Sequence, residues 1–224
     1  MNTFLHRFEV LPPPQQAVWH LLAPAKDLGL VLYGGTAIAL RLGHRTSIDF
    51  DFFSSLTLDK DLLLKTMPFL GEKPPEQDKA NTFTVITRNV KFSFLGNLTF
   101  GCFTPPELTS DRILQVAALD DLLALKIKVI HERSERKDFQ DIAALLRQGV
   151  PLERGLAIAE RMFAPSLSPM IALRALTYFE GGDVPSLSKA EKETLILATR
   201  FTKPLPVVSP ISQELSAYRE DKTT

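Results

Sequence analysis

Apolar residues in the first half of the chain recur with two periods, one typical of helices and one typical of strands. Leu28–Tyr33 and Ser47–Phe53 are short β-favouring runs, and the second alternates polar and apolar residues. Gln15–Lys26, which follows three prolines, and Thr36–Leu42 have helical spacing. We further expect a helix over Leu58–Leu70, a loop over Lys73–Asn81, a hairpin of Thr82–Thr87 and Val90–Leu95 around Arg88-Asn89, and a strand over Thr99–Thr104.

The second half of the chain changes to helical periodicity after Pro105-Pro106. The expected helices are Asp120–His131, Lys137–Arg147, Leu152–Phe163, Pro169–Phe179, Lys189–Phe201 and Ile211–Arg219, and a frayed tail is expected over Glu220–Thr224. Segments that contain glycine and proline separate these helices. The sequence therefore predicts an α+β protein, with an α/β domain over residues 1–105 and a helical domain over residues 106–224.

Composition and charge narrow the class of protein. The 26 Lys and Arg residues balance the 26 Asp and Glu residues, so no global charge attracts nucleic acid or an anionic membrane. Cys102 is the only cysteine, which excludes an intramolecular disulfide and a thiolate zinc site. The apolar runs are too short for a membrane helix, and Met1–Leu11 is charged where a signal peptide is apolar. We therefore expect a cytoplasmic protein without a membrane partner.

The run Ser47–Phe53 carries the first candidate chemistry. Residues two apart on a strand face the same way, so Asp49 and Asp51 share one face while Ile48, Phe50 and Phe52 share the core face. Two carboxylates beside an apolar layer repel each other, and a divalent cation would remove this penalty. Oxygen ligands favour Mg²⁺ or Mn²⁺. The alternative is a solvated strand face with two incidental aspartates.

Gly34-Gly35-Thr36 lies between an apolar strand and a helix, where backbone amides and the Thr36 hydroxyl could bind a phosphate. A Gly-Gly pair can also be a simple turn, and this one matches neither a P-loop nor a Rossmann fingerprint. Arg45 is the best candidate to balance polyphosphate charge, and Ser47 is a further candidate for nucleotide binding. The alternative for Arg41, His44 and Arg45, the basic residues between the glycines and the aspartates, is a basic helix end at which their charges offset the helix dipole.

A second cluster lies in the helical half. Lys126 is on an otherwise apolar helix face and would sit close to the core, whereas Lys128 is on another face. Asp138 and Asp141 are three residues apart and can share a face of the next helix. An exposed charged turn explains Glu132–Lys137, but a lysine on an apolar face usually has a partner.

Four motifs together resemble a known family. They are Tyr33-Gly34-Gly35-Thr36, Arg45-Thr46-Ser47-Ile48-Asp49-Phe50-Asp51-Phe52-Phe53, Lys126, and Lys137-Asp138 with Asp141. The sequence resembles the AbiEii/AbiGii nucleotidyltransferases, the toxin side of type IV toxin–antitoxin systems, within the polymerase-β-like superfamily. The resemblance covers about residues 30–147.

The resemblance implies a mixed sheet with flanking helices, a helical half that completes a cleft, and a magnesium-bound nucleoside triphosphate. The reaction would transfer a nucleoside monophosphate to an acceptor hydroxyl, with RNA or tRNA as the expected acceptor and a cognate antitoxin as an expected partner. The matched residues are Gly34, Gly35 and Thr36 for the triphosphate, Asp49 and Asp51 for the metal, Lys126 for the nucleotide or the transfer step, and Asp138 or Asp141 for the last acidic motif.

One position departs from this pattern. The superfamily's third metal-binding carboxylate belongs on a following strand, and the matching run Val90–Leu95 has Ser93 there. Serine is a poor magnesium ligand and is not a base. The leading hypothesis is an active nucleotidyltransferase, and the alternative is a catalytically weakened nucleotide-binding module that acts through a protein partner.

Overall fold

The protein divides into two compact units. In the computed structural model, which describes residues 1–200 and 204–217, the first unit contains Met1–Ala118 and the segment that begins at Ile211. The second unit is Leu119–Pro210. The sequence analysis divided the chain between residues 105 and 106, whereas the compact units divide between Ala118 and Leu119, and the chain then returns to the first unit.

The first unit is built on a mixed sheet that has eight strands within the described residues, in the order β1-β7-β8-β2-β3-β6-β5-β4. The strands are β1 (Thr3–Phe4), β2 (Val31–Tyr33), β3 (Asp49–Phe53), β4 (Gln77–Lys79), β5 (Thr82–Thr87), β6 (Val90–Leu95), β7 (Glu107–Thr109) and β8 (Gln115–Val116). β3 pairs in parallel with β6 and antiparallel with β2. The two central neighbours of β3 therefore run in opposite directions.

Three of the expected strand assignments need correction. The expected loop over Lys73–Asn81 contains β4, and β7 and β8 follow Pro105-Pro106, where the β-rich part was expected to end. Thr99–Thr104 is not a strand, although Cys102 forms an isolated bridge with Ser212. β4, β7 and β8 have only two or three residues each. Such strands are too short to show a period in the sequence, and they are defined by the strands with which they pair.

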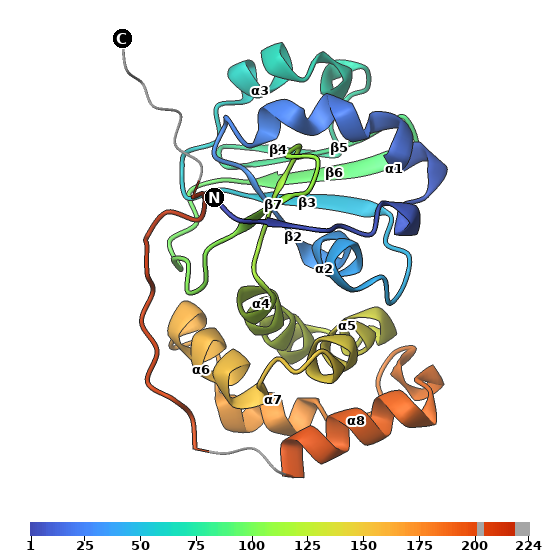
Figure 1. The fold of residues 1–224 in the computed structure, drawn as a ribbon, viewed down its shortest axis with the longest axis vertical. Coiled ribbons are helices and arrows are strands. Elements are labelled where there is room, and N and C mark those ends of the chain that lie inside the picture. The colour runs from blue at the N-terminus through green and yellow to red at the C-terminus, as the bar shows by residue number, and fades with distance from the viewer. Residues whose placement is uncertain (201–203, 218–224) are drawn as a thin grey trace. The chain divides into compact units, whose positions relative to one another are not determined.

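Helices cover both faces of this sheet (Figure 1). α1 (Pro13–Val18) and α3 (Lys60–Thr66) lie over one face, and α2 (Gly34–Leu42) lies over the other. The helix expected over Gln15–Lys26 is α1 followed by a 3-10 helix, Trp19–Ala25, which contains Pro24. The helix expected over Leu58–Leu70 is α3 followed by a separate 3-10 turn, Pro68–Gly71.

The core of the first unit is rich in stacked phenylalanines. Phe50 and Phe52 of β3 are fully buried and stack on Phe92 and Phe94 of β6, with ring centroids 5.6 and 5.2 Å apart. Trp19 packs against Phe50 from the α1 side of the sheet. This aromatic layer fixes which face of β3 points into the core, and therefore which face carries the polar residues.

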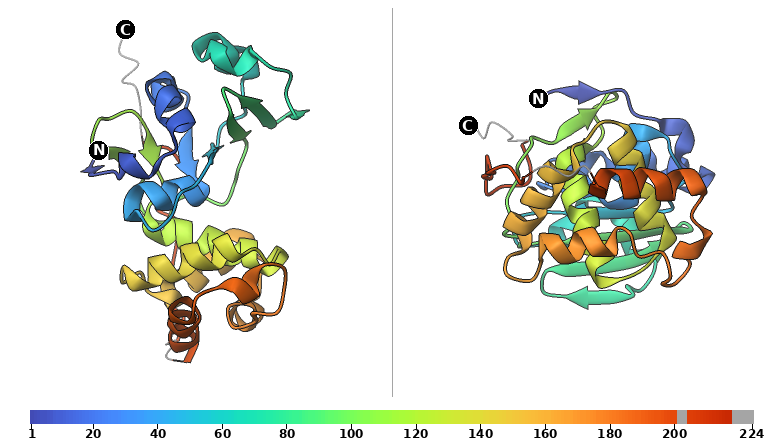
Figure 2. Two further views of the ribbon diagram at one scale, coloured as in Figure 1. Left: turned by 90° about the vertical axis from the view of Figure 1, so that its right-hand side faces the viewer. Right: turned by 90° about the horizontal axis from the view of Figure 1, so that it is seen from below.

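The second unit is helical. Its helices are α4 (Leu119–Glu132), α5 (Arg136–Arg147), α6 (Leu152–Phe163), α7 (Pro169–Ala175) and α8 (Lys189–Arg200). α4 packs on α5 and α6, and α5 packs on α8, an arrangement that Figure 2 shows from two further directions. None of the helices in the described ranges is long and apolar enough to span a membrane.

Two of the helices expected in the second half differ from the structure. α7 ends at Ala175, four residues before the expected end at Phe179. The described part of the helix expected over Ile211–Arg219 is not helical, since its residues up to Ala217 form bends, an isolated bridge at Ser212 and irregular structure. Phe201, Tyr218, Arg219 and the tail expected over Glu220–Thr224 lie outside the described residues.

Candidate active site

Strand β3 presents Asp49 and Asp51 on the face opposite its buried phenylalanines. Both aspartates are half-buried, and the alternating burial along the strand confirms that they share a face. Ile48, expected on the core face, instead precedes the strand and is 64% exposed. A pair of carboxylates at this spacing can offer oxygen ligands to one divalent cation.

The pairing of β3 with β6 places Ser93 beside this carboxylate pair. In the parallel register Ser93 lies opposite Asp51, and Lys91 lies opposite Asp49. Residues paired in this way point to the same face of a sheet. Lys91 forms an ion pair with Glu76, with 3.2 Å between Lys91 Nζ and Glu76 Oε2. Within the described residues there is no cluster of three or more His, Cys, Asp or Glu side chains that could hold a metal. The donor set at this place is therefore two carboxylates.

The glycine turn at the start of α2 lies against these residues. Gly34 has φ +74°, and a Cβ there would overlap Asp51 Oδ2. A Cβ on Gly35 would overlap Nη2 of Arg45 and come within 3.0 Å of Ser47 Oγ. The fold thus brings both glycines, Arg45, Ser47 and Asp51 together at one helix N-terminus. Backbone amides and a guanidinium at such a place suit a phosphate group.

Thr36 links the glycine turn to the carboxylate strand. Thr36 is 1% exposed, and its hydroxyl donates a hydrogen bond to the backbone carbonyl of Asp49. The hydroxyl hydrogen that the sequence analysis expected to serve a phosphate is thus used within the protein. In this structure Thr36 positions β3 relative to α2.

Arg41 anchors the other end of α2. Its guanidinium donates from Nε to the carbonyl of Ala117 at 2.8 Å and from Nη2 to that of Val116 at 2.9 Å. Nη1 pairs with Glu107 Oε2 at 2.8 Å. Burial lowers the pKa of Arg41, and the hydrogen bond and charge of Glu107 partly offset this. Arg41 therefore holds α2 on β7 and β8 and is not available to a ligand, a role that the sequence analysis missed.

The remaining predicted site residues form a buried ion cluster inside the second unit. Lys126 of α4 is 5% exposed, and its Nζ lies 2.6 Å from Asp138 Oδ1 and 2.7 Å from Asp141 Oδ2 on α5. Both aspartates are fully buried, and Arg133 Nε lies 2.9 Å from Asp138 Oδ2. Lys128 instead pairs with Glu132 near the surface, with Nζ 3.0 Å from Oε1. The partner expected for Lys126 is thus an aspartate pair.

A sequence model of one protein family matches residues 16–180. Its description is a nucleotidyl transferase AbiEii toxin of type IV toxin–antitoxin systems. The match covers most of the chain, and the chain therefore belongs to the AbiEii toxin family. The protein is a nucleotidyltransferase with an α+β fold, as the resemblance of its motifs implied.

The chain is also similar to individual proteins. An uncharacterized protein of Aquifex aeolicus (strain VF5) is 28% identical over 152 residues, which cover 66% of this chain and 73% of the relative. A candidate nucleotidyltransferase from H. pylori has a similar crystal structure, with 15% identity, a TM-score of 0.51, and coverage of 84% of this chain and 92% of that one. MenT4, a nucleotidyltransferase toxin from Mycobacterium tuberculosis H37Rv, has 14% identity, a TM-score of 0.49, and coverage of 84% of this chain and 91% of its own.

Proposed function

We propose that the protein transfers a nucleoside monophosphate from a nucleoside triphosphate to an acceptor hydroxyl, with Asp49 and Asp51 as the ligands of Mg²⁺ or Mn²⁺. The observation that carries this proposal is the close approach of the Asp51 carboxylate to the backbone of Gly34. A phosphate held at the glycine turn and a cation held by the aspartates would then be neighbours. This is the arrangement that a metal-bound triphosphate requires.

The cation fits the residues present, since the two carboxylates on one strand face are hard oxygen donors. When bound, it would neutralise triphosphate charge and polarise the α-phosphoryl group. The backbone amides of Gly34 and Gly35 would bind phosphate oxygens, and Arg45 would balance their remaining charge. Ser47, which lies beside Gly35, is a further polar contact for the nucleotide.

In the proposed reaction the acceptor oxygen bonds to the α-phosphorus while the bond from that phosphorus to the bridging oxygen breaks. Pyrophosphate leaves with the electrons of that bond, and the acceptor hydroxyl loses its proton to a base. The position opposite Asp51 on β6 is Ser93, so this base is not supplied there. The protein's contribution is then mainly positioning and charge stabilisation.

The acceptor, the partner and the location are proposed from family membership. An RNA hydroxyl, in particular a tRNA end, is the proposed acceptor, and a cognate antitoxin is the proposed partner. Nucleoside triphosphates and tRNA are cytoplasmic, which is also the proposed location. Lys126, Asp138 and Asp141 stay predicted catalytic residues, and their mutual ion pairs give them a structural role as well.

Radiolabelled nucleotide transfer to total RNA tests the proposal. Each of the four α-labelled triphosphates is incubated with the protein and Mg²⁺, and labelled RNA is quantified. Asp49→Asn and Asp51→Asn should abolish labelling while leaving the thermal unfolding curve intact, because both side chains lie off the core face. Asp61→Asn, on the exposed first turn of α3, is the matched control and should label normally. Wild-type labelling by both site variants would refute the metal assignment.

A weakened nucleotide-binding module is the second candidate, and Ser93 is the observation that favours it. Such a protein would bind triphosphate in a manner that depends on Asp49 and Asp51 but would label no RNA. Equilibrium binding of a fluorescent triphosphate, measured beside the labelling assay, separates the two candidates.

A further inference from the structure

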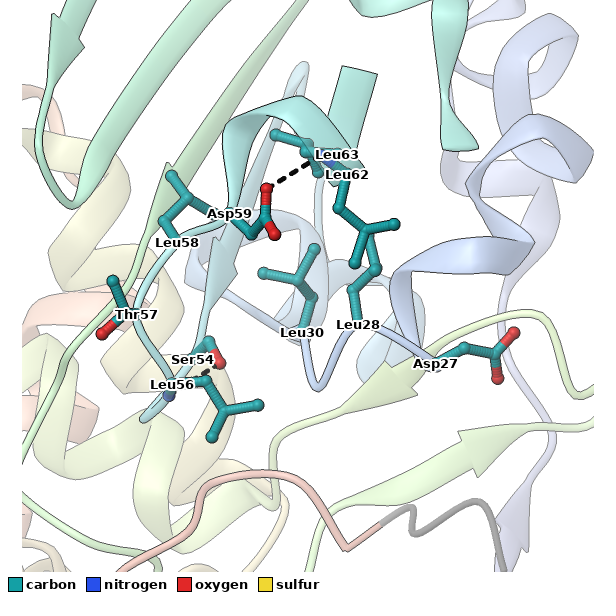
Figure 3. A pocket seen from close by; sticks show the side chains of 10 residues that line it. All are labelled: Asp27, Leu28, Leu30, Ser54, Leu56, Thr57, Leu58, Asp59, Leu62 and Leu63. Atoms are coloured by element: carbon teal, nitrogen blue, oxygen red, sulfur yellow. Dashed lines mark hydrogen bonds between the residues drawn. The ribbon is translucent and has the colours of Figure 1, made fainter. Parts of the chain in front are cut away.

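The first unit contains an apolar pocket at the far end of β3 from Asp49. Three segments form it: the turn before β2, the loop after β3, and α3 (Figure 3). Its lining is dominated by leucines, namely Leu28, Leu30, Leu56, Leu58, Leu62 and Leu63. Leu30, Leu58 and Leu63 are buried, whereas Leu56 and Leu62 are 55% and 42% exposed. The pocket therefore has a packed floor and apolar walls that reach the surface.

The size of the pocket limits what can fill it. Its volume is about 180 Å³. An apolar protein cavity of about 150 Å³ binds one benzene molecule, whereas sites for whole cofactors and drug-sized ligands have about 300 Å³ or more. The pocket consequently fits one large apolar side chain, such as leucine or phenylalanine, and is too small for a nucleotide.

The polar rim of the pocket has one sign of charge. Of the ten described residues that line it, two are aspartates, Asp27 and Asp59, and none is basic. Asp59 lies between Leu58 and Leu62 in Figure 3, and its Oδ1 accepts a hydrogen bond from the backbone amide of Leu62 at 2.9 Å. Asp27 is exposed at the outer edge and points away from the leucines. Exposed carboxylates around an apolar pocket favour an apolar group that carries positive charge nearby.

We propose that this pocket is a docking site for a basic segment of a partner protein, which inserts one aliphatic or aromatic side chain between Leu56 and Leu62. Lysine or arginine residues on either side of that anchor would face Asp27 and Asp59. The pocket shares no residue with the glycine turn or with Asp49 and Asp51. The proposal is therefore independent of the proposed reaction.

A labelled peptide tests the site on the full-length protein. The probe is a short fluorescein-labelled peptide with one Leu between Lys residues, and its binding is followed by fluorescence anisotropy. We expect saturable binding that weakens as salt is added, because the charged rim is exposed. The same peptide with Glu in place of Lys, or with Ser in place of the Leu anchor, should bind at least about tenfold more weakly.

Matched variants locate the binding. Leu62→Gln should weaken peptide binding about fivefold or more, and Asp27→Asn about twofold to fivefold. Leu197→Gln and Glu160→Gln are controls, since both change exposed residues of the second unit and should leave the affinity unchanged. Equal binding of the Lys and Glu peptides, or equal loss in site and control variants, would overturn the proposal. A change of oligomeric state in Leu62→Gln would overturn it as well, because the occupant would then be a second copy of this chain.

Discussion

Gly34 at the start of α2 approaches the Asp51 carboxylate so closely that a Cβ on this glycine would lie 3.2 Å from Asp51 Cγ and would overlap Oδ2. The backbone of Gly34 also has φ +74°, a conformation that L-residues with side chains rarely adopt. Two separate requirements therefore select glycine here. The positive φ is needed for the conformation of the turn. The absence of a Cβ leaves room for the Asp51 carboxylate beside the backbone that would hold the phosphate.

Gly34→Ala should abolish nucleotide transfer because the new methyl group displaces Asp51. The positive φ alone should destabilise the protein by about 1–2 kcal/mol. The effect is measured by RNA labelling and by urea unfolding. Gly149→Ala is the matched control, since Gly149 has φ +91° but a Cβ added there would meet no atom within 4 Å. It should lose similar stability and keep its activity. Equal activity of the two variants would show that the contact with Asp51 is unimportant.

Thr36→Val keeps the shape of the buried side chain but removes the hydroxyl that binds the Asp49 carbonyl. We expect a loss of about 1–3 kcal/mol of unfolding free energy, because a partly buried carbonyl loses its donor. Transfer should slow because β3 is no longer fixed to α2. Thr36→Ser restores the donor and should recover most of the rate and stability. If Thr36→Val raises the KM for nucleotide without affecting stability, the hydroxyl instead contacts the phosphate.

Lys126→Ala should be strongly destabilising. It would leave Asp138 and Asp141 buried without the ammonium that both contact, and removal of one partner from a buried ion pair costs about 3–5 kcal/mol. Lys128→Ala, which removes a pair at the surface, should cost less than about 1 kcal/mol. Urea unfolding of the two variants measures the difference. Equal, small effects would show that the cluster does not stabilise the second unit.

A neutral replacement of the whole cluster separates stability from catalysis. Lys126→Met combined with Asp138→Asn and Asp141→Asn leaves no uncompensated acidic partner of Lys126, so much of the lost stability should return. If this variant folds and still labels RNA at the wild-type rate, the cluster is structural only. Loss of labelling in the folded variant would support the catalytic role that the family resemblance implies.

The parts of the fold that carry their own local pattern could be predicted from the sequence. The hairpin of β5 and β6 has the expected limits, and both turn residues, Arg88 and Asn89, have positive φ. This conformation matches the twist of two strands joined by a two-residue loop. The alternation of charged and aromatic residues in β3 likewise predicted which residues face the core, apart from Ile48, which precedes the strand.

The parts that depend on distant partners could not be predicted. β8 consists of Gln115–Val116 and exists because Val116 pairs with Leu32 in the centre of the sheet. Arg41 anchors α2 by binding residues in and next to β7 and β8. Because these two strands were not predicted, the role of Arg41 could not be predicted either. In the second unit, the spacing of Asp138 and Asp141 predicted a shared helix face, but only the packing of α4 on α5 makes both of them partners of Lys126.

Ser93 offers the sharpest test of the carboxylate site, because its register opposite Asp51 places a substitution beside the proposed metal ligands. Two-metal transfer uses a further carboxylate to hold the cation that activates the attacking oxygen. With serine at this position, a second cation should bind weakly, and transfer should be slow although nucleotide binding is normal. Ser93→Asp would add the missing ligand beside Asp51.

Without metal, Ser93→Asp should destabilise the protein by about 0.2–1 kcal/mol, because like charges on neighbouring strands repel. Mg²⁺ should reverse this loss, so that the metal raises the melting temperature more in Ser93→Asp than in the wild type. Nucleotide affinity should be nearly unchanged, and the transfer rate should be equal to or higher than that of the wild type. Ser93→Ala, which adds no charge, should show no enhanced response to Mg²⁺. Loss of nucleotide binding or unfolding in Ser93→Asp would mean instead that Ser93 is a packing position and that the third carboxylate expected from the superfamily pattern has no counterpart on β6.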